Sequence, residues 1–215
     1  MSNNREAIQG FEKGDYKLTR RVNMENQIYV FIDNSFLFIE GYKHVRNVAK
    51  LSPGKTPYVD YFALRKFIQK SGELRRTVIC GSDLPGSMIS KCQSAGFEVF
   101  TFPKYPSFKT GNLEEKGIDL KIAWEIAKTL FTSRDPVQNK KIILCTGDKD
   151  FMSIFHDIQT CNWAFEILLW SNSYSKKFVD QAKVFGNVRI LDEEWKQFIK
   201  IGDAKKAIEV TGVRS

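Results

Sequence analysis

Short apolar runs alternate with amphipathic segments along most of the chain. Runs rich in β-branched and aromatic residues are typical of buried strands, and they occupy residues 28–32, 77–80, 97–102, 142–145, 165–170 and 188–191. Apolar residues recur at helical spacing between these runs, at residues 61–68, 89–92, 118–130, 151–158, 178–182 and 192–199. Residues 36–41 suggest a short helix, and residues 47–57 read as a loop.

The alternation of strands and helices predicts an α/β fold. Near-continuous apolar strands indicate a sheet that is covered on both faces, because an exposed face would need alternating polar residues. We therefore expect a three-layer α/β/α sandwich with a mainly parallel sheet of about five to six strands and right-handed crossovers. Residues 1–26 are expected to form a flexible leader, residues 27–200 the domain, and residues 201–215 the end of a last helix and a tail.

Acidic residues follow the predicted strands at their carboxyl ends, which is the edge where α/β sheets bind ligands. Asp33 ends the first strand, and Asp148 and Asp150 follow the fourth. Asp119 lies in the first turn of the helix before the fourth strand, and such helix starts lie at the same edge. The four carboxylates therefore converge in this interpretation, although each alone could equally be a helix cap or an Asx turn.

Crowded carboxylates repel one another, and a bound cation relieves the repulsion. Mg²⁺ and Mn²⁺ prefer oxygen ligands, and the chemistry that uses such a site is phosphodiester hydrolysis. We therefore predict that Asp33, Asp119, Asp148 and Asp150 are both metal ligands and catalytic residues. Asp83 also follows a strand, but the turn sequence after it favours a structural role, and Glu114 and Glu115 read as solvated charges at a helix start.

Charge favours a polyanionic partner. The 215 residues carry a net charge of +8, and lysine or arginine at phosphate groups releases counterions. The loop from Lys104 to Lys109 mixes cations with aromatic rings, a combination that suits unpaired bases. No apolar segment reads as a signal peptide or a membrane helix, and the four cysteines have no zinc-ligand spacing, so a cytoplasmic or nuclear protein without membrane contact is expected.

Three linked motifs resemble those of the NYN domain family within the PIN-like nuclease superfamily, in its LabA-like branch. They are Tyr29-Val30-Phe31-Ile32-Asp33-Asn34-Ser35, Glu115-Lys116-Gly117-Ile118-Asp119 and Thr146-Gly147-Asp148-Lys149-Asp150-Phe151. The segment from Phe165 to Ala182 is similar to the closing strand and helix of these domains. The resemblance covers roughly residues 27–192, and it departs at Phe36, where many relatives have asparagine.

The resemblance implies a PIN-like fold and a ribonuclease, more endonucleolytic than exonucleolytic, that depends on Mg²⁺ or Mn²⁺ and takes part in RNA processing. It gives ligand roles to the four aspartates named above. We expect single-stranded RNA as the partner, with a homodimer or a protein complex as a further option. RNA contacts are predicted for Asn34, Ser35, Lys104, Lys109, Lys116, Lys149 and Ser173.

Two other functions stay open at this point. The first is an RNA-binding or scaffold module without turnover, which the apolar Phe36 favours. The second is a phosphatase of the HAD type, because Asp148-Lys149-Asp150 supplies a D-x-D after a strand. Such an enzyme needs one aspartate as nucleophile and the other as acid, but Phe151 and Met152 replace the small β-branched residues expected after its motif.

Overall fold

The computed structural model describes residues 26–107, 111–133 and 139–203. Its centre is a six-stranded sheet in which every neighbouring pair is parallel. The strands are β1 (Gln27–Asp33), β3 (Glu73–Ser82), β4 (Glu98–Phe102), β7 (Lys140–Cys145), β8 (Ala164–Leu169) and β9 (Asn187–Ile190), and their order across the sheet is β4-β3-β1-β7-β8-β9. The predicted α/β sandwich with a mainly parallel sheet is confirmed.

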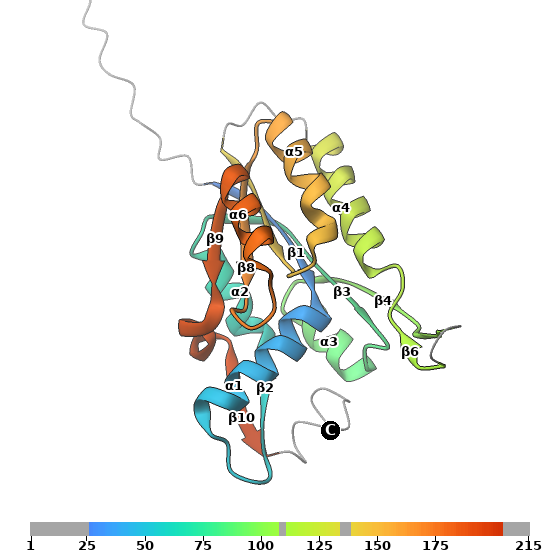
Figure 1. The fold of residues 1–215 in the computed structure, drawn as a ribbon, viewed down its shortest axis with the longest axis vertical. Helices are drawn as coiled ribbons and strands as arrows, with labels where there is room; N and C mark the ends of the chain where they lie inside the picture. The colour runs from blue at the N-terminus through green and yellow to red at the C-terminus, as the bar shows by residue number, and fades with distance from the viewer. Residues whose placement is uncertain (1–25, 108–110, 134–138, 204–215) are drawn as a thin grey trace, which may run out of the picture.

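Helices cover both faces of the sheet (Figure 1). On one face lie α4 (Ile118–Thr132), which packs on β1 and β3, α5 (Met152–Thr160) on β8, and α6 (Lys176–Phe185) on β9. On the other face lie α2 (Tyr61–Gln69) and α3 (Gly86–Ser94). The π-helical turn η1 (Phe36–Glu40) and α1 (Gly41–Ala49) follow β1 beyond the edge of the sheet.

The order of the strands fixes where a ligand would bind. From β1 the chain first runs outward through β3 to β4, and then returns across the sheet to add β7, β8 and β9 on the other side of β1. The direction of winding therefore reverses between β1 and β7. Crevices beyond the carboxyl ends of the strands at such a reversal are the usual ligand sites of α/β sheets.

Buried strands and capped helices account for this architecture. Residues 28–32 of β1 are at most 6% exposed, as a strand covered on both faces requires. Cys80 and Cys145 pack in the core as small apolar side chains, and burial raises the pKa of the Cys80 thiol to about 12. Asp60 begins α2 as predicted, because its Oδ1 accepts the Ala63 N–H at 3.0 Å. None of the helices in the described ranges has the length and apolar composition needed to cross a membrane.

Two sequence predictions near the ends of the domain are wrong. Residues 55–57, the end of the stretch taken as loop, belong to the strand β2 (Lys55–Val59). The helix expected from Asp192 through Ile199 is replaced by two 3₁₀ turns, η3 (Leu191–Glu193) and η4 (Trp195–Gln197), followed by β10 (Ile199–Asp203). β10 pairs antiparallel with β2. The helical spacing of the apolar residues yields here to hydrogen bonds with a strand about 140 residues earlier, a partner that local pattern cannot reveal.

The predicted loop before α4 also contains regular structure. Its two-residue strands β5 (Tyr105–Pro106) and β6 (Leu113–Glu114) pair antiparallel and form a small hairpin. This hairpin carries Lys104 on one side and Glu115 on the other, next to the start of α4. The β5–β6 pairing orders the hairpin itself, and the hydrogen bond from Ser35 to Glu115 ties its end to the residues that follow β1.

Candidate metal centre

Asp33 is the last residue of β1 and also caps the helical turn that follows it. Its Oδ1 accepts the N–H groups of Ser35 at 2.9 Å and Phe36 at 3.2 Å. A side chain that satisfies free N–H groups at a helix start stabilises that start. Both hydrogen bonds are accepted by Oδ1, so Asp33 can cap the turn with Oδ1 and still present Oδ2 to a ligand.

Asp148 has a similar double character at the end of β7. Its Oδ1 accepts the Asp150 N–H at 2.8 Å, and its own N–H is donated to Thr146 Oγ1 at 3.2 Å. These bonds begin the 3₁₀ turn η2 (Lys149–Phe151), which leads into α5. The turn leaves Asp150 exposed at the edge of the sheet beside Asp148.

Asp119 reaches the same edge from α4. Gly117 precedes the helix with a φ of +84°, a left-handed conformation that glycine adopts without the steric penalty of a side chain. This turn ends the approach from the β5–β6 hairpin and places Asp119 in the first turn of the helix. The position near a helix N-terminus favours its negative charge.

Electrostatics show that these acids lie close to one another. The pKa of Asp33 is raised from 3.8 to about 7, first by burial and then by the charges of Asp119 and Glu115, against the lowering effect of its backbone hydrogen bonds. The pKa of Asp119 is also raised, first by burial and then by Asp148, Asp150 and Glu115. Asp119 thus interacts with acids from two other segments, after β1 and after β7, and with Glu115 in its own segment. A positive ion placed among them would lower the free energy of all the charged forms.

Glu115 belongs to this cluster, although the sequence analysis took it as a solvated charge. Its Oε1 accepts a hydrogen bond from Ser35 Oγ at 2.8 Å and lies 3.8 Å from Lys104 Nζ. Its charge also raises the pKa of both Asp33 and Asp119. The sequence offered one signal for this role, the place of Glu115 in the second motif, two residues before Gly117. Its contact with Ser35 could not be read from local pattern, because the two residues are 80 positions apart.

The donor set fits a hydrated divalent ion better than a closed metal cage. Across residues 26–107, 111–133 and 139–203, no three His, Cys, Asp or Glu side chains stand close enough to hold one ion among them. Mg²⁺ keeps several water ligands and is usually held by one or two carboxylates together with substrate phosphates. Asp33 and Asp119 supply such oxygen donors, and their mutual repulsion is what an ion would relieve.

Phe36 joins the two central loops of the edge by an apolar contact. The Phe36 ring packs directly against Gly147. A Cβ added to Gly147 would lie 2.5 Å from Phe36 Cε2 and 2.5 Å from the carbonyl oxygen of Ser173, which is too close for either atom. Glycine is therefore required at position 147 by close packing. Phe36 is 9% exposed, and its ring packs between the loops after β1 and β7.

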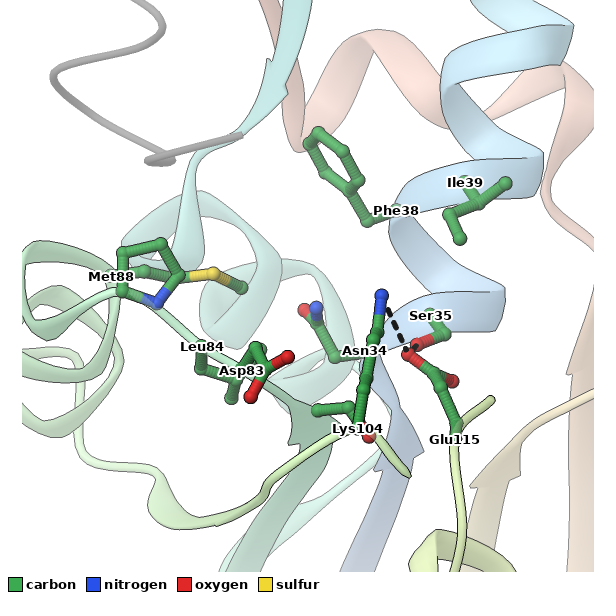
Figure 2. Close-up of a pocket in the computed structure, with 11 residues that line it drawn as sticks. Asn34, Ser35, Phe38, Ile39, Asp83, Leu84, Met88, Lys104 and Glu115 are labelled. Carbon is green, nitrogen blue, oxygen red and sulfur yellow. Dashed lines mark hydrogen bonds and ion pairs between the residues drawn. The ribbon is translucent and has the colours of Figure 1, made fainter. Parts of the chain in front are cut away.

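The predicted RNA-binding residues do not all lie in one place. Asn34, Ser35 and Lys104 line one pocket at the carboxyl ends of β1 and β3, together with Asp83 and Glu115 (Figure 2). Lys116 lines a separate pocket with Tyr105 and Pro106. Lys149 is exposed between Asp148 and Asp150. The hydroxyl of Ser173 donates to the Trp170 carbonyl at 2.9 Å. Lys109 lies outside the described residues.

Comparison with known proteins shows the family and the fold. The sequence model of the NYN domain matches residues 27–189. Among solved structures with a similar fold is a protein of unknown function from Vibrio parahaemolyticus, with a TM-score of 0.56 and 17% sequence identity over 84% of this chain and 100% of that chain. At this identity the likeness shows the fold alone. No curated protein matches the chain.

Proposed function

The chain belongs to the NYN domain family, and we propose that it is a ribonuclease that hydrolyses phosphodiester bonds of RNA with a bound Mg²⁺ or Mn²⁺. The observation that carries the proposal is the mutual repulsion of acids from separate segments at the reversal point of the sheet. A fold gains no stability from such crowding, so its presence at the usual ligand position favours a functional site.

Asp33 and Asp119 are the residues that we propose as the primary ion ligands. Asp148 and Asp150 lie close enough to Asp119 for their charges to raise its pKa. A divalent ion held there would lower the pKa of an attacking water and stabilise charge on the reacting phosphate.

The protein's own groups prepare this site in three ways. The hydrogen bonds from Ser35 and Phe36 hold the Asp33 carboxylate in one orientation. Asp148 and Asp150 could hold a second ion, or they could accept hydrogen bonds from the attacking water and so orient it. Lys149, exposed between them, could contact a phosphate of the bound strand. The net charge of +8 favours RNA binding as a whole.

A cleavage assay tests the proposal directly. Labelled single-stranded RNA would be incubated with the protein and Mg²⁺ or Mn²⁺, with and without chelator. We expect cleavage that the chelator abolishes and that falls by about 10–100-fold or more in Asp33→Asn and Asp148→Asn, because the loss of a group that only orients a metal ligand already costs about 10–100-fold. Asp157→Asn is a matched control, because Asp157 is an exposed acid on α5, and it should cleave like the wild type.

The second candidate function is RNA binding without turnover. Two observations favour it: Phe36 fills the space between the central loops with an apolar ring, and no three acids in the described ranges gather around one point. In the same assay this function would appear as a gel shift of intact RNA, unchanged by metal or by the aspartate variants. Release of phosphate from small monoesters, with RNA left intact, would instead indicate the HAD type of chemistry.

A further inference from the structure

A pocket lies beside the acid cluster, at the carboxyl ends of β1 and β3 (Figure 2). Apolar side chains from η1, from the turn after β3 and from α3 form part of its wall, and these include Phe38, Leu84 and Met88. Polar groups form the rest, and these include Asn34, Ser82 and Asp83. Lys104 and Glu115 complete it from the β5–β6 hairpin.

Ser82 indicates that this pocket is built for a ligand. The residue is 8% exposed, and its Oγ has no hydrogen-bond partner within the described part of the chain. A buried hydroxyl without a partner costs free energy that an apolar residue would avoid. The cost is recovered when the side chain turns toward the pocket and a bound molecule supplies the missing hydrogen bond.

Asn34 presents a second polar group to the same space. Its Oδ1 accepts the Tyr61 hydroxyl at 3.1 Å, and the residue is 6% exposed. This bond fixes the amide and leaves Nδ2 as the end that makes no hydrogen bond to the described residues. The pocket therefore combines a free hydroxyl, a free amide donor and apolar walls.

Asp83 adds an acceptor that points to a particular ligand chemistry. Asp83 lines the pocket together with Lys104, whose Nζ lies 3.8 Å from Glu115 Oε1 (Figure 2). An ionised carboxylate accepts hydrogen bonds through both oxygens and donates none. It therefore selects a flat partner with two adjacent N–H donors, and guanine has this arrangement at N1 and N2, next to the O6 acceptor.

We propose that this pocket holds one unpaired base of the RNA strand and selects guanine. The Asp83 carboxylate accepts from the N1–H and N2–H groups, while Asn34 Nδ2 donates to O6, and Ser82 Oγ reaches a ring nitrogen once its side chain turns toward the pocket. The apolar walls cover the faces of the base. Adenine, cytosine and uracil each place an acceptor where guanine has one of these two donors, so each sets an acceptor against the carboxylate.

The pocket also shares residues with the acid cluster, which ties base recognition to the position of cleavage. Ser35 lines the pocket, and its N–H is bonded to Asp33 and its hydroxyl to Glu115. A base seated here would place the neighbouring phosphates along the acids. This link between base recognition and cleavage rests on the proposed ribonuclease function. The binding of the base itself needs no metal.

A binding experiment in chelator separates base recognition from catalysis. The probes are labelled uridine octamers in which one central position is U, A, C or G, bound to the full chain in EDTA. We expect the single G to raise affinity about tenfold over A and C, the discrimination typical of one bidentate pair between a side chain and a base. Asp83→Asn and Ser82→Ala should each reduce this advantage, and Asp83→Asn should reduce it to less than about twofold because it replaces an acceptor oxygen by a donor.

Two features make the variants informative. Asp83 is exposed and has a φ of +48°, a conformation that asparagine tolerates well, so Asp83→Asn is expected to fold. Glu114→Gln is the matched control, because Glu114 is an exposed acid of β6 outside the pocket, and it should keep the full preference for G.

Equal affinity for the four octamers would overturn the proposal, and so would an undiminished preference for G in Asp83→Asn. A preference for G in protein that shows no metal-dependent cleavage would support the pocket and reject the nuclease. Cleavage without any preference among bases would reject the pocket and leave the nuclease standing.

Discussion

Removing the charge of Asp33 should stabilise the metal-free protein at alkaline pH, although the residue is proposed as functional. Burial and the charges of Asp119 and Glu115 raise its pKa from 3.8 to about 7. Asparagine keeps an Oδ1 that can accept the two N–H groups bonded to Asp33, so that Asp33→Asn removes the charge and retains the helix cap.

The sign of the effect follows from proton linkage. A carboxyl with a higher pKa in the folded state binds its proton more tightly when folded, so folding stability falls as pH rises from about 4 to about 7 and is constant above. A pKa raised from 3.8 to about 7 corresponds to a loss of at most about 4 kcal/mol. Since the surroundings relax around the charge, we expect Asp33→Asn to be more stable than the wild type by between about 2 and 4 kcal/mol at pH 8, and by about 1.5 kcal/mol at pH 5, where the unfolded chain is already mostly ionised at this residue.

Urea unfolding in EDTA, followed by circular dichroism at pH 5 and pH 8, measures this difference. The control is Asp157→Asn, which removes an exposed charge and should change the free energy of unfolding by less than about 0.5 kcal/mol at either pH. Adding Mg²⁺ at pH 8 should stabilise the wild type, by about 2.7 kcal/mol at 100 times the dissociation constant, but not Asp33→Asn.

The reasoning would be refuted if Asp33→Asn were less stable than the wild type at pH 8, or equally stable at both pH values. Either result would mean that the Asp33 charge is well solvated or well paired. Crowding of acids could then no longer be taken as the sign of an ion site.

Three further predictions concern binding and packing. Lys104→Ala should weaken RNA binding and reduce the slope of log affinity against log salt by about 0.7, the value for one phosphate contact on a single strand, whereas an unchanged slope would remove Lys104 from the interface. Gly147→Ala should cost about 1–3 kcal/mol in thermal unfolding, because the new Cβ would lie 2.5 Å from Phe36 Cε2, and an unchanged melting temperature would contradict this packing. Glu125→Ala should lower the free energy of unfolding in urea by about 3–5 kcal/mol, because its carboxylate is 2% exposed and binds Arg76 at 2.6 Å. A loss below about 1 kcal/mol would show that Arg76 finds other partners.

Local pattern was sufficient for the central sheet and for most of the helices. Apolar runs such as residues 28–32 have no stable place except a strand covered on both faces, and Asp60 signals the start of α2 through its own side chain. Family membership was likewise readable from three motifs, and the match over residues 27–189 confirms it. The metal-ligand and RNA-binding roles of individual residues stay predictions.

Local pattern failed where a distant partner decides the outcome. Residues 55–59 include Pro57 and begin with an exposed lysine, and they form a strand only because residues 199–203 supply hydrogen bonds. The apolar spacing of Trp195 and Phe198 predicted a helix, but this pairing with β2 replaced it.

The sequence by itself determined which segments are strands and that acids follow them, because both depend on neighbours in the chain. Only the tertiary structure decided which acids share one electrostatic environment, that Glu115 joins them, and that the hydroxyl of Ser82 is buried without a partner. These properties arise from solvent exclusion and from distances between segments up to about 115 residues apart, as Asp33 and Asp148 are. Burial and charge repulsion come into existence only when the folded chain brings those segments together.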